Sequence, residues 1–132
     1  MCIALSFVSK AQCDKTIKWK SSKTEFIDAA GNVKRTNDET VEVTTTKTRV
    51  TIVVHGPVEE TMSGDITDYS CNWTNKQNGK TSFKAIVVDH SGDRRHATIT
   101  FEAINGKTTM LLHAEEEPDD IRLTVDSFEE TE

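Results

Sequence analysis

Residues 96–114, HATITFEAINGKTTMLLHA, hold an Asn-Gly pair between two stretches in which apolar and polar residues alternate. Asn105-Gly106 is the dipeptide preferred in a type I′ hairpin turn, because both central positions of that turn need a positive φ. A turn there places Ile104 opposite Lys107 and fixes the pairing of every residue behind it. One face of the resulting antiparallel hairpin is apolar. The pairs expected on that face are Phe101–Met110, Ile99–Leu112 and Ala97–Ala114.

A second turn, at His90-Ser91-Gly92, extends this sheet by one strand. A tight turn there places Ala85 opposite Ala97 and Phe83 opposite Ile99, and so keeps the apolar face continuous. The alternative register puts a lysine on that face, which its burial cost disfavours. The apolar face then carries a row of small side chains from three strands, Ala85, Ala97 and Ala114. The row is either the floor of a ligand cavity or the place where Trp19 or Trp73 packs from across the protein.

Strand-forming stretches separated by turn residues continue along the rest of the chain. The sequence has 19 threonines and only four leucines, and β-branched side chains favour strands over helices. We expect strands near 15–27, 40–46, 48–55, 64–74, 81–88, 94–104, 107–115 and 121–128. The sequence therefore predicts a single all-β domain over residues 12–132, an antiparallel meander of about eight strands.

Two features of this meander resemble the lipocalins (the calycin group): Trp19 early in the first strand and the later triplet Thr67-Asp68-Tyr69. The resemblance covers about residues 15–128 by strand pattern, and Ile17 stands where lipocalins have a glycine. It implies a barrel that holds a small apolar molecule in its interior. Tyr69 is the residue expected to supply a polar contact to that ligand. The inward-facing residues predicted to line the ligand site are Trp19, Tyr69, Phe83, Ala85, Ala97, Phe101, Met110 and Leu112.

Residues 65–71 also resemble the tyrosine corner of immunoglobulin domains, because Tyr69 stands two residues before Cys71. This resemblance implies an immunoglobulin-like β-sandwich as the alternative fold. Much more strand pattern follows Cys71 than the one strand that an immunoglobulin domain would still have, so the barrel is the preferred prediction.

The first eleven residues, MCIALSFVSKA, differ from the rest of the chain. Their apolar run is too short to span a bilayer, and no transmembrane segment is predicted. Small residues at Ser9 and Ala11 fit a signal-peptidase site, so we interpret residues 1–11 as a truncated signal peptide, with an N-terminal segment of the fold as the alternative. The expected location is secreted or periplasmic, with the cytoplasm as the alternative. Removal of this leader leaves Cys13 and Cys71, which predicts one disulfide between them.

The charge distribution bears on partners. A formal net charge of −6 argues against a nucleic-acid partner, which requires a basic face. Residues 1–50 hold nine Lys and Arg against six Asp and Glu, whereas residues 101–132 hold two against ten. The acidic part is either a surface for a cationic partner or an ordinary solvated surface. Closure of a barrel would also place the lysine-rich first strand beside the acidic last strand.

The sequence has no phosphate-binding glycine loop and no nucleophile elbow. Asp89, His90 and Ser91 superficially resemble a catalytic triad, but a single tight turn explains them better. His96, His113 and Glu115 share one face of the hairpin in a way that zinc would accept, yet this is the solvent face, where such residues are ordinary.

Two arginines at the start of the same hairpin, Arg94 and Arg95, are expected across from Glu117 and Glu116. No catalytic residue, metal or cofactor is therefore predicted. The function that follows is an exported, non-enzymatic barrel that binds a small apolar ligand. The alternative is a solid barrel or sandwich that acts through its outer surface, and the sequence does not indicate an oligomeric state.

Overall fold

The computed structural model describes Cys13 and residues 15–131. These residues form nine strands and contain no helix. The strands are β1 (Thr16–Ile27), β2 (Val33–Asn37), β3 (Thr40–Thr45), β4 (Arg49–His55), β5 (Glu60–Asn75), β6 (Asn78–Val88), β7 (Arg94–Ile104), β8 (Lys107–Ala114) and β9 (Asp120–Thr131). The described residues accordingly include no helix with the length and apolar character needed to cross a membrane. The leader expected over residues 1–11 lies outside the described residues.

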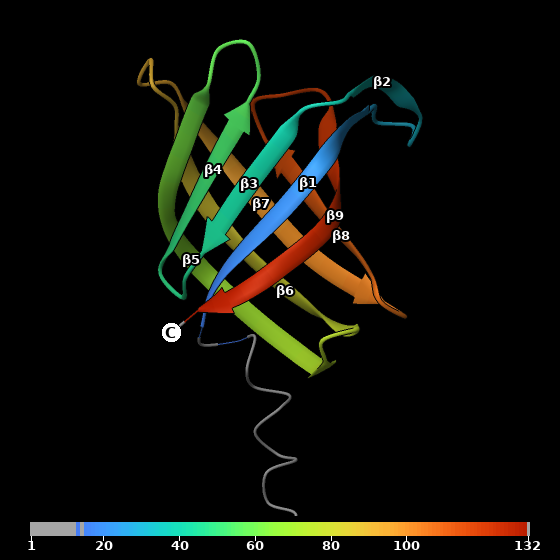
Figure 1. The fold of residues 1–132 in the computed structure, drawn as a ribbon. Helices are drawn as coiled ribbons and strands as arrows, with labels where there is room; N and C mark the ends of the chain where they lie inside the picture. Colours follow the sequence, from blue (N-terminus) through green and yellow to red (C-terminus); the bar gives the residue numbers. More distant parts are fainter. Residues whose placement is uncertain (1–12, 14, 132) are drawn as a thin grey trace, which may run out of the picture.

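Eight of the nine strands close into an antiparallel barrel. Neighbouring strands follow the order β1-β3-β4-β5-β6-β7-β8-β9, and β9 pairs with β1 to complete the ring. Trp19 of β1 lies opposite Phe128 of β9 at this closure, and Figure 1 shows the two strands side by side. The predicted all-β meander and its barrel are therefore confirmed, and the sandwich alternative is not the fold.

The hairpins of the Phe83–Ala114 sheet have the predicted registers. Phe83 pairs with Ile99, and Phe101 pairs with Met110. At the turn between β7 and β8, Asn105 has a φ of 52° and Gly106 a φ of 82°, as a type I′ turn requires. The turn residues together with the apolar alternation of the strands therefore predict which side chains enter the barrel.

Strand β2 was not predicted from the sequence. This strand pairs with the last residues of β1, from Thr24 opposite Asn37 to Ile27 opposite Val33, and lies outside the barrel ring. Its side chains are exposed except for the half-buried Asn37. A strand with no buried face shows no apolar alternation, so its sequence gave no signal.

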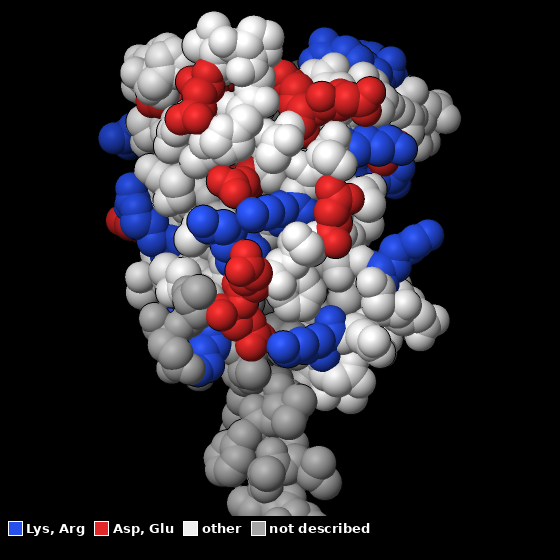
Figure 2. Space-filling model, in the orientation of Figure 1, with Lys and Arg blue, Asp and Glu red and all other residues white. Residues whose placement is uncertain are grey.

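The basic and acidic ends of the chain meet as the barrel hypothesis expected. Lys18 of β1 lies opposite Glu129 of β9, and Figure 2 shows basic and acidic side chains interspersed on this face. One ion pair across the same seam has the opposite polarity, because Arg122 Nε of β9 donates to Glu25 Oε1 of β1 at 2.8 Å. This hydrogen bond lowers the pKa of Glu25. Each of the two strands at the seam therefore places a basic side chain near an acidic side chain of the other.

Candidate ligand-binding site

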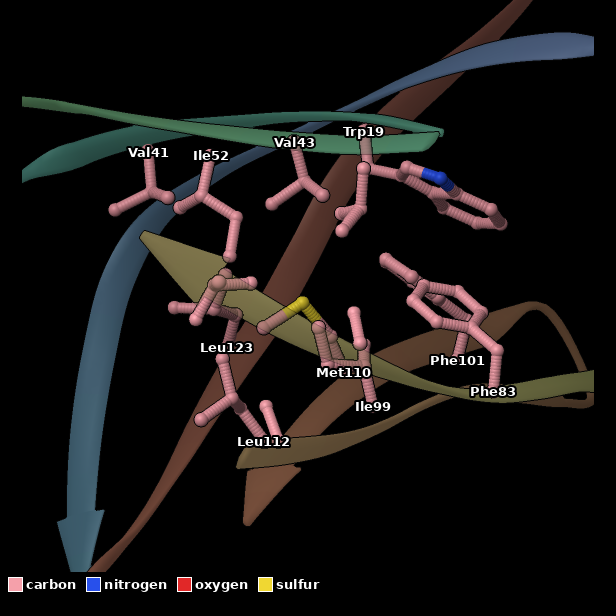
Figure 3. Packing of buried hydrophobic residues seen from close by; sticks show 14 of the residues in the cluster. Trp19, Val41, Val43, Ile52, Phe83, Ile99, Phe101, Met110, Leu112 and Leu123 are labelled. Atoms are coloured by element: carbon pink, nitrogen blue, oxygen red, sulfur yellow. The ribbon is translucent and has the colours of Figure 1, made fainter. Parts of the chain in front are cut away.

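The half of the barrel next to the β7–β8 turn is filled with aromatic side chains. Trp19 stacks on Phe101 with ring centroids 4.1 Å apart, and it lies 4.9 Å from Phe128 and 6.3 Å from Trp73. Figure 3 shows the Trp19 ring lying over Phe101. Trp19 and Trp73 are only 2% and 3% exposed, so this half holds side chains and not a ligand.

Both buried indoles have their N–H groups satisfied. Trp19 Nε1 donates to Thr45 Oγ1 at 3.0 Å, and Trp73 Nε1 donates to Thr81 Oγ1 at 2.7 Å. Buried polar groups that find such partners fix the orientation of the rings that carry them. The aromatic filling is therefore a rigid floor for whatever lies beyond it.

Beyond this floor, toward the end of the barrel where β1, β4, β6 and β8 terminate, the interior is hollow. We call this end the mouth; it is the upper end in Figure 1. The inner hollow has a volume of about 220 Å³. Figure 3 shows Val41 and Ile52 pointing from one wall toward Leu112 and Leu123 of the other. Its lining residues are Thr24, Phe26, Glu39, Val41, Ile52, Val54, Glu60, Met62, Met110, Leu112, Ile121 and Leu123.

A second hollow of about 430 Å³ lies at the mouth itself. It adjoins the inner hollow, because the two share several lining residues, among them Phe26, Met62 and Ile121. Charged groups at its rim are Arg35, Glu60, Asp89, Arg95, Glu117 and Asp119. The interior therefore changes from apolar to charged along one path to solvent.

One rim cation is held in place by two carboxylates. Arg95 Nε donates to Glu117 Oε2 at 2.9 Å, and a second guanidinium nitrogen lies 3.3 Å from Asp89 Oδ2. The hydrogen bond to Glu117, followed by that to Asp89, raises the pKa of Arg95. The predicted pairs Arg94–Glu117 and Arg95–Glu116 are both wrong, since Glu117 pairs with Arg95 and Glu116 pairs with His96. The backbone N–H of Glu117 donates to the Ala114 carbonyl at 3.1 Å, so the chain turns after Ala114 and these acidic side chains do not continue the strand ladder.

The pKa of Asp89 is also perturbed. Burial raises it, but the backbone N–H groups of Asp93 and Ser91 and the Arg95 side chain together lower it below its ordinary value. Asp89 Oδ1 accepts both backbone hydrogen bonds, at 3.0 and 2.9 Å. Asp89 is thus a turn-forming residue that also fixes Arg95, in keeping with its interpretation as part of a turn.

The eight residues predicted to line a ligand site fall in four places. Met110 and Leu112 line the inner hollow. Trp19, Phe83 and Phe101 belong to the aromatic filling, in which Phe83 and Phe101 lie 6.4 Å apart. Ala85 and Ala97 are 4% and 3% exposed within the hydrophobic core and line neither interior hollow, although the hollow on the outside of the barrel borders them from the other face of the sheet. Tyr69 lines none of these three hollows, and its Oη donates to the Cys13 carbonyl.

The remaining wall of the interior came from strands to which the sequence analysis assigned no site. Val41, Ile52 and Leu123 are buried members of alternating stretches in β3, β4 and β9. The alternation of apolar and polar residues, which predicted the inward face of β7 and β8, could also have predicted these inward-facing residues. Thr24 and Phe26 gave no such signal, because the register of β1 shifts between Ser21 and Thr24 and breaks the alternation.

A disulfide joins Cys13 to Cys71 of β5, with the two Cα atoms 5.6 Å apart. The distance lies within the range that a disulfide spans without moving the backbone. Together with the Tyr69 hydrogen bond to the Cys13 carbonyl, it ties the start of the described chain to β5.

The histidines of the β7–β8 hairpin are each engaged by a carboxylate. His96 Nδ1 lies 2.5 Å from Glu116 Oε2, and this hydrogen bond, with the negative charge of Glu116, raises the pKa of His96. His113 Nδ1 lies 2.7 Å from Asp120 Oδ1. Across Cys13 and residues 15–131, no group of three or more His, Cys, Asp or Glu side chains is placed to hold a metal ion.

The outer hollow, of about 540 Å³, lies over β5, β6 and β7. Polar side chains such as Thr67, Lys84 and His96 line it. Arg49 at its edge already has partners within the protein. One guanidinium nitrogen lies 2.9 Å from Asp65 Oδ1, and the other donates to Ser63 Oγ at 2.9 Å. This surface mixes polar and apolar residues, unlike the inner hollow, whose lining is mostly apolar.

No protein-family model matches the chain, and neither a curated protein nor a solved structure matches it.

Proposed function

We propose that this protein binds a small, partly apolar molecule in the mouth half of its barrel. The observation that carries the proposal is the inner hollow, which has apolar walls and opens through the larger hollow at the mouth. Small-molecule sites are typically concave, mostly apolar hollows of roughly 300–1,000 Å³ with a few polar groups. The inner hollow alone is smaller than this range and the mouth hollow lies within it, so the ligand is small.

In this proposal the protein binds and carries the small molecule and catalyses no reaction on it. Transfer of apolar surface from water into a dry hollow is favourable by about 25 cal/mol per Å². The rigid aromatic floor limits how deep a ligand goes, and the charged rim leaves a polar end in contact with water. A lipocalin-like carrier in a secreted or periplasmic location fits this arrangement, and the Cys13–Cys71 disulfide supports such an oxidising location.

The test uses two adjacent valines of β4 that face opposite ways. Val54 lines the inner hollow, whereas Val53 lines none of the three hollows. We expect the neutral lipophilic probe 1-aminoanthracene to bind the wild-type protein saturably, with a rise in its fluorescence. Val54→Phe should abolish that binding by filling the hollow, and the matched variant Val53→Phe should retain it. Absence of saturable binding, or equal binding by the two variants, would refute interior binding.

A second candidate function is an interaction module that works through its outer surface. The outer hollow over β5, β6 and β7 is the observation that favours it. Such a module would not bind 1-aminoanthracene in a manner sensitive to Val54→Phe, so the same experiment separates the two candidates.

A further inference from the structure

We propose that the inner hollow is specific for an organic cation, namely a small amphipathic amine whose ammonium group lies between Glu39 and Glu60. This inference rests on the interior binding proposed above and adds the chemical class of the ligand. It is carried by the charges that line the inner hollow and by one buried hydroxyl group.

Among the described residues, the charged ones that line the inner hollow are the two glutamates, Glu39 and Glu60. Neither carboxylate has an ion pair or a side-chain hydrogen bond with another residue in the described part of the chain. Of the other rim carboxylates, Asp89 and Glu117 share one cation, Arg95. Negative charge without a partner is thus concentrated where the apolar hollow begins.

Asp119 is also paired with a cation, since its Oδ2 lies 3.3 Å from Lys34 Nζ. Arg35 also carries a positive charge at the mouth, but it does not line the inner hollow. Its guanidinium carbon lies 4.2 Å from the centroid of the Phe26 ring, which holds it on the β2 side. A ligand in the inner hollow therefore meets carboxylates and no basic side chain.

Thr24 supplies an independent indication of a polar ligand group. It lines the same hollow and is only 7% exposed, yet its Oγ1 has no hydrogen-bond partner in the structure. Buried hydroxyl groups are nearly always hydrogen-bonded, and an exception calls for a partner that is missing. Oγ1 is itself buried as the side chain stands, and a rotation about the Cα–Cβ bond, which exchanges Oγ1 with the methyl group, is needed to present the oxygen to a ligand.

The strand registers place Thr24 and Glu39 at the same corner of the barrel. Ser21 of β1 pairs with Val41 of β3, and Thr24 pairs with Asn37 of β2. Glu39 lies in the short link between these two partners, where β1 passes from β3 to β2. An ammonium group has three N–H donors, and two carboxylates and one hydroxyl oxygen are acceptors for all three.

The apolar walls define the rest of the ligand. Val41, Ile52, Met110 and Leu123 leave room for a short hydrocarbon group in about 220 Å³. A carboxylate ligand of the same shape would bring a third negative charge beside Glu39 and Glu60. Like charges placed together in this way discriminate against the wrong ligand.

The test compares three probes with the same tail and different heads, octylamine, octan-1-ol and octanoate, by isothermal titration calorimetry at neutral pH. We expect octylamine to bind about tenfold more tightly than octan-1-ol, since hydrogen bonds to charged groups are stronger than neutral ones. Octanoate should bind more weakly than octan-1-ol. Equal affinity for amine and alcohol, or a preference for octanoate, would overturn the inference.

Matched charge variants assign the preference to the hollow. Glu39→Gln with Glu60→Gln should lower the affinity for octylamine to about that for octan-1-ol, and leave the affinity for octan-1-ol unchanged. The control, Glu102→Gln with Glu129→Gln, removes two carboxylates from exposed positions outside the hollow and should keep the preference. A control that loses the preference equally would show that the general negative surface attracts the amine, and would overturn the inference. Binding of octan-1-ol without any preference for the amine leaves interior binding intact, whereas failure of all three probes refutes both proposals.

Discussion

Gly64 provides the most direct test of the barrel geometry, because at this residue β5 lies against the backbone of β6. A Cβ atom added at Gly64 would lie 2.1 Å from the carbonyl oxygen and 2.8 Å from the carbonyl carbon of Ile86. Ordinary van der Waals contact of a Cβ begins at 3.4 Å. The Gly64→Ala variant must therefore move the two backbones apart by about 1.3 Å, since neither clashing atom belongs to a flexible side chain.

The expected loss of stability follows from two opposing effects. Overpacking of this kind costs about 1–3 kcal/mol. The smaller conformational entropy of the unfolded alanine chain offsets about 0.4–1 kcal/mol of that cost. We expect the free energy of unfolding of Gly64→Ala to be about 1.5 kcal/mol lower than that of the wild type.

The measurement is urea unfolding followed by the fluorescence of Trp19 and Trp73, both of which are buried. The matched control is Gly56→Ala, whose Cβ would approach within 2.7 Å only of Oε2 at the end of the flexible Glu39 side chain. The control should differ from the wild type by less than about 0.5 kcal/mol. A Gly64→Ala variant as stable as the wild type, or a control that loses as much stability, would show that β5 and β6 do not approach as described.

Two further predictions concern individual hydrogen bonds. Glu116→Gln should lower the pKa of His96 in an NMR titration, because the hydrogen bond and charge of Glu116 raise it; an unchanged pKa would contradict the pairing. Since His96 has a raised pKa and Glu116 a lowered pKa in the folded state, the pair stabilises the protein between those two values. The higher free energy of unfolding of the wild type relative to the variant is therefore lost as pH rises through the raised pKa of His96. It is also lost as pH falls through the lowered pKa of Glu116. Thr45→Val should reduce the free energy of unfolding in urea by about 1–3 kcal/mol by leaving the buried Trp19 Nε1 without an acceptor. Thr45→Ser keeps the hydroxyl group and should be less destabilised, so equal losses in the two variants would argue against that hydrogen bond.

Much of the barrel was predictable from the sequence, because short-range signals specify antiparallel hairpins. The Asn105-Gly106 turn fixed the β7–β8 register, and the turn before Arg94 fixed the register of β6 against β7. The location of the site was predictable only in part. Met110 and Leu112 line the inner hollow, but the predicted Trp19, Phe83 and Phe101 fill the opposite half.

The residues that give the site its charge had no local signal. Glu39 lies in a short link between strands, and Glu60 is an exposed residue at the start of β5. Each looks like an ordinary solvated acid in the sequence. Thr24 follows an irregularity in β1 that shifts the inward-facing set, so counting alternate residues does not find it.

The sequence by itself determined which side chains face inward in the β6–β8 sheet, because strand alternation and turn geometry are local properties of the chain. It also determined that a basic and an acidic strand are available at the two ends. Only the tertiary structure decided that β9 returns to β1, which half of the interior the two indoles fill, and which glutamates line the hollow. Those outcomes depend on contacts between residues far apart in the chain, such as Trp19 with Phe101 and Phe128. Alternation specifies the face on which a side chain lies, and packing across the closed barrel specifies the space that remains.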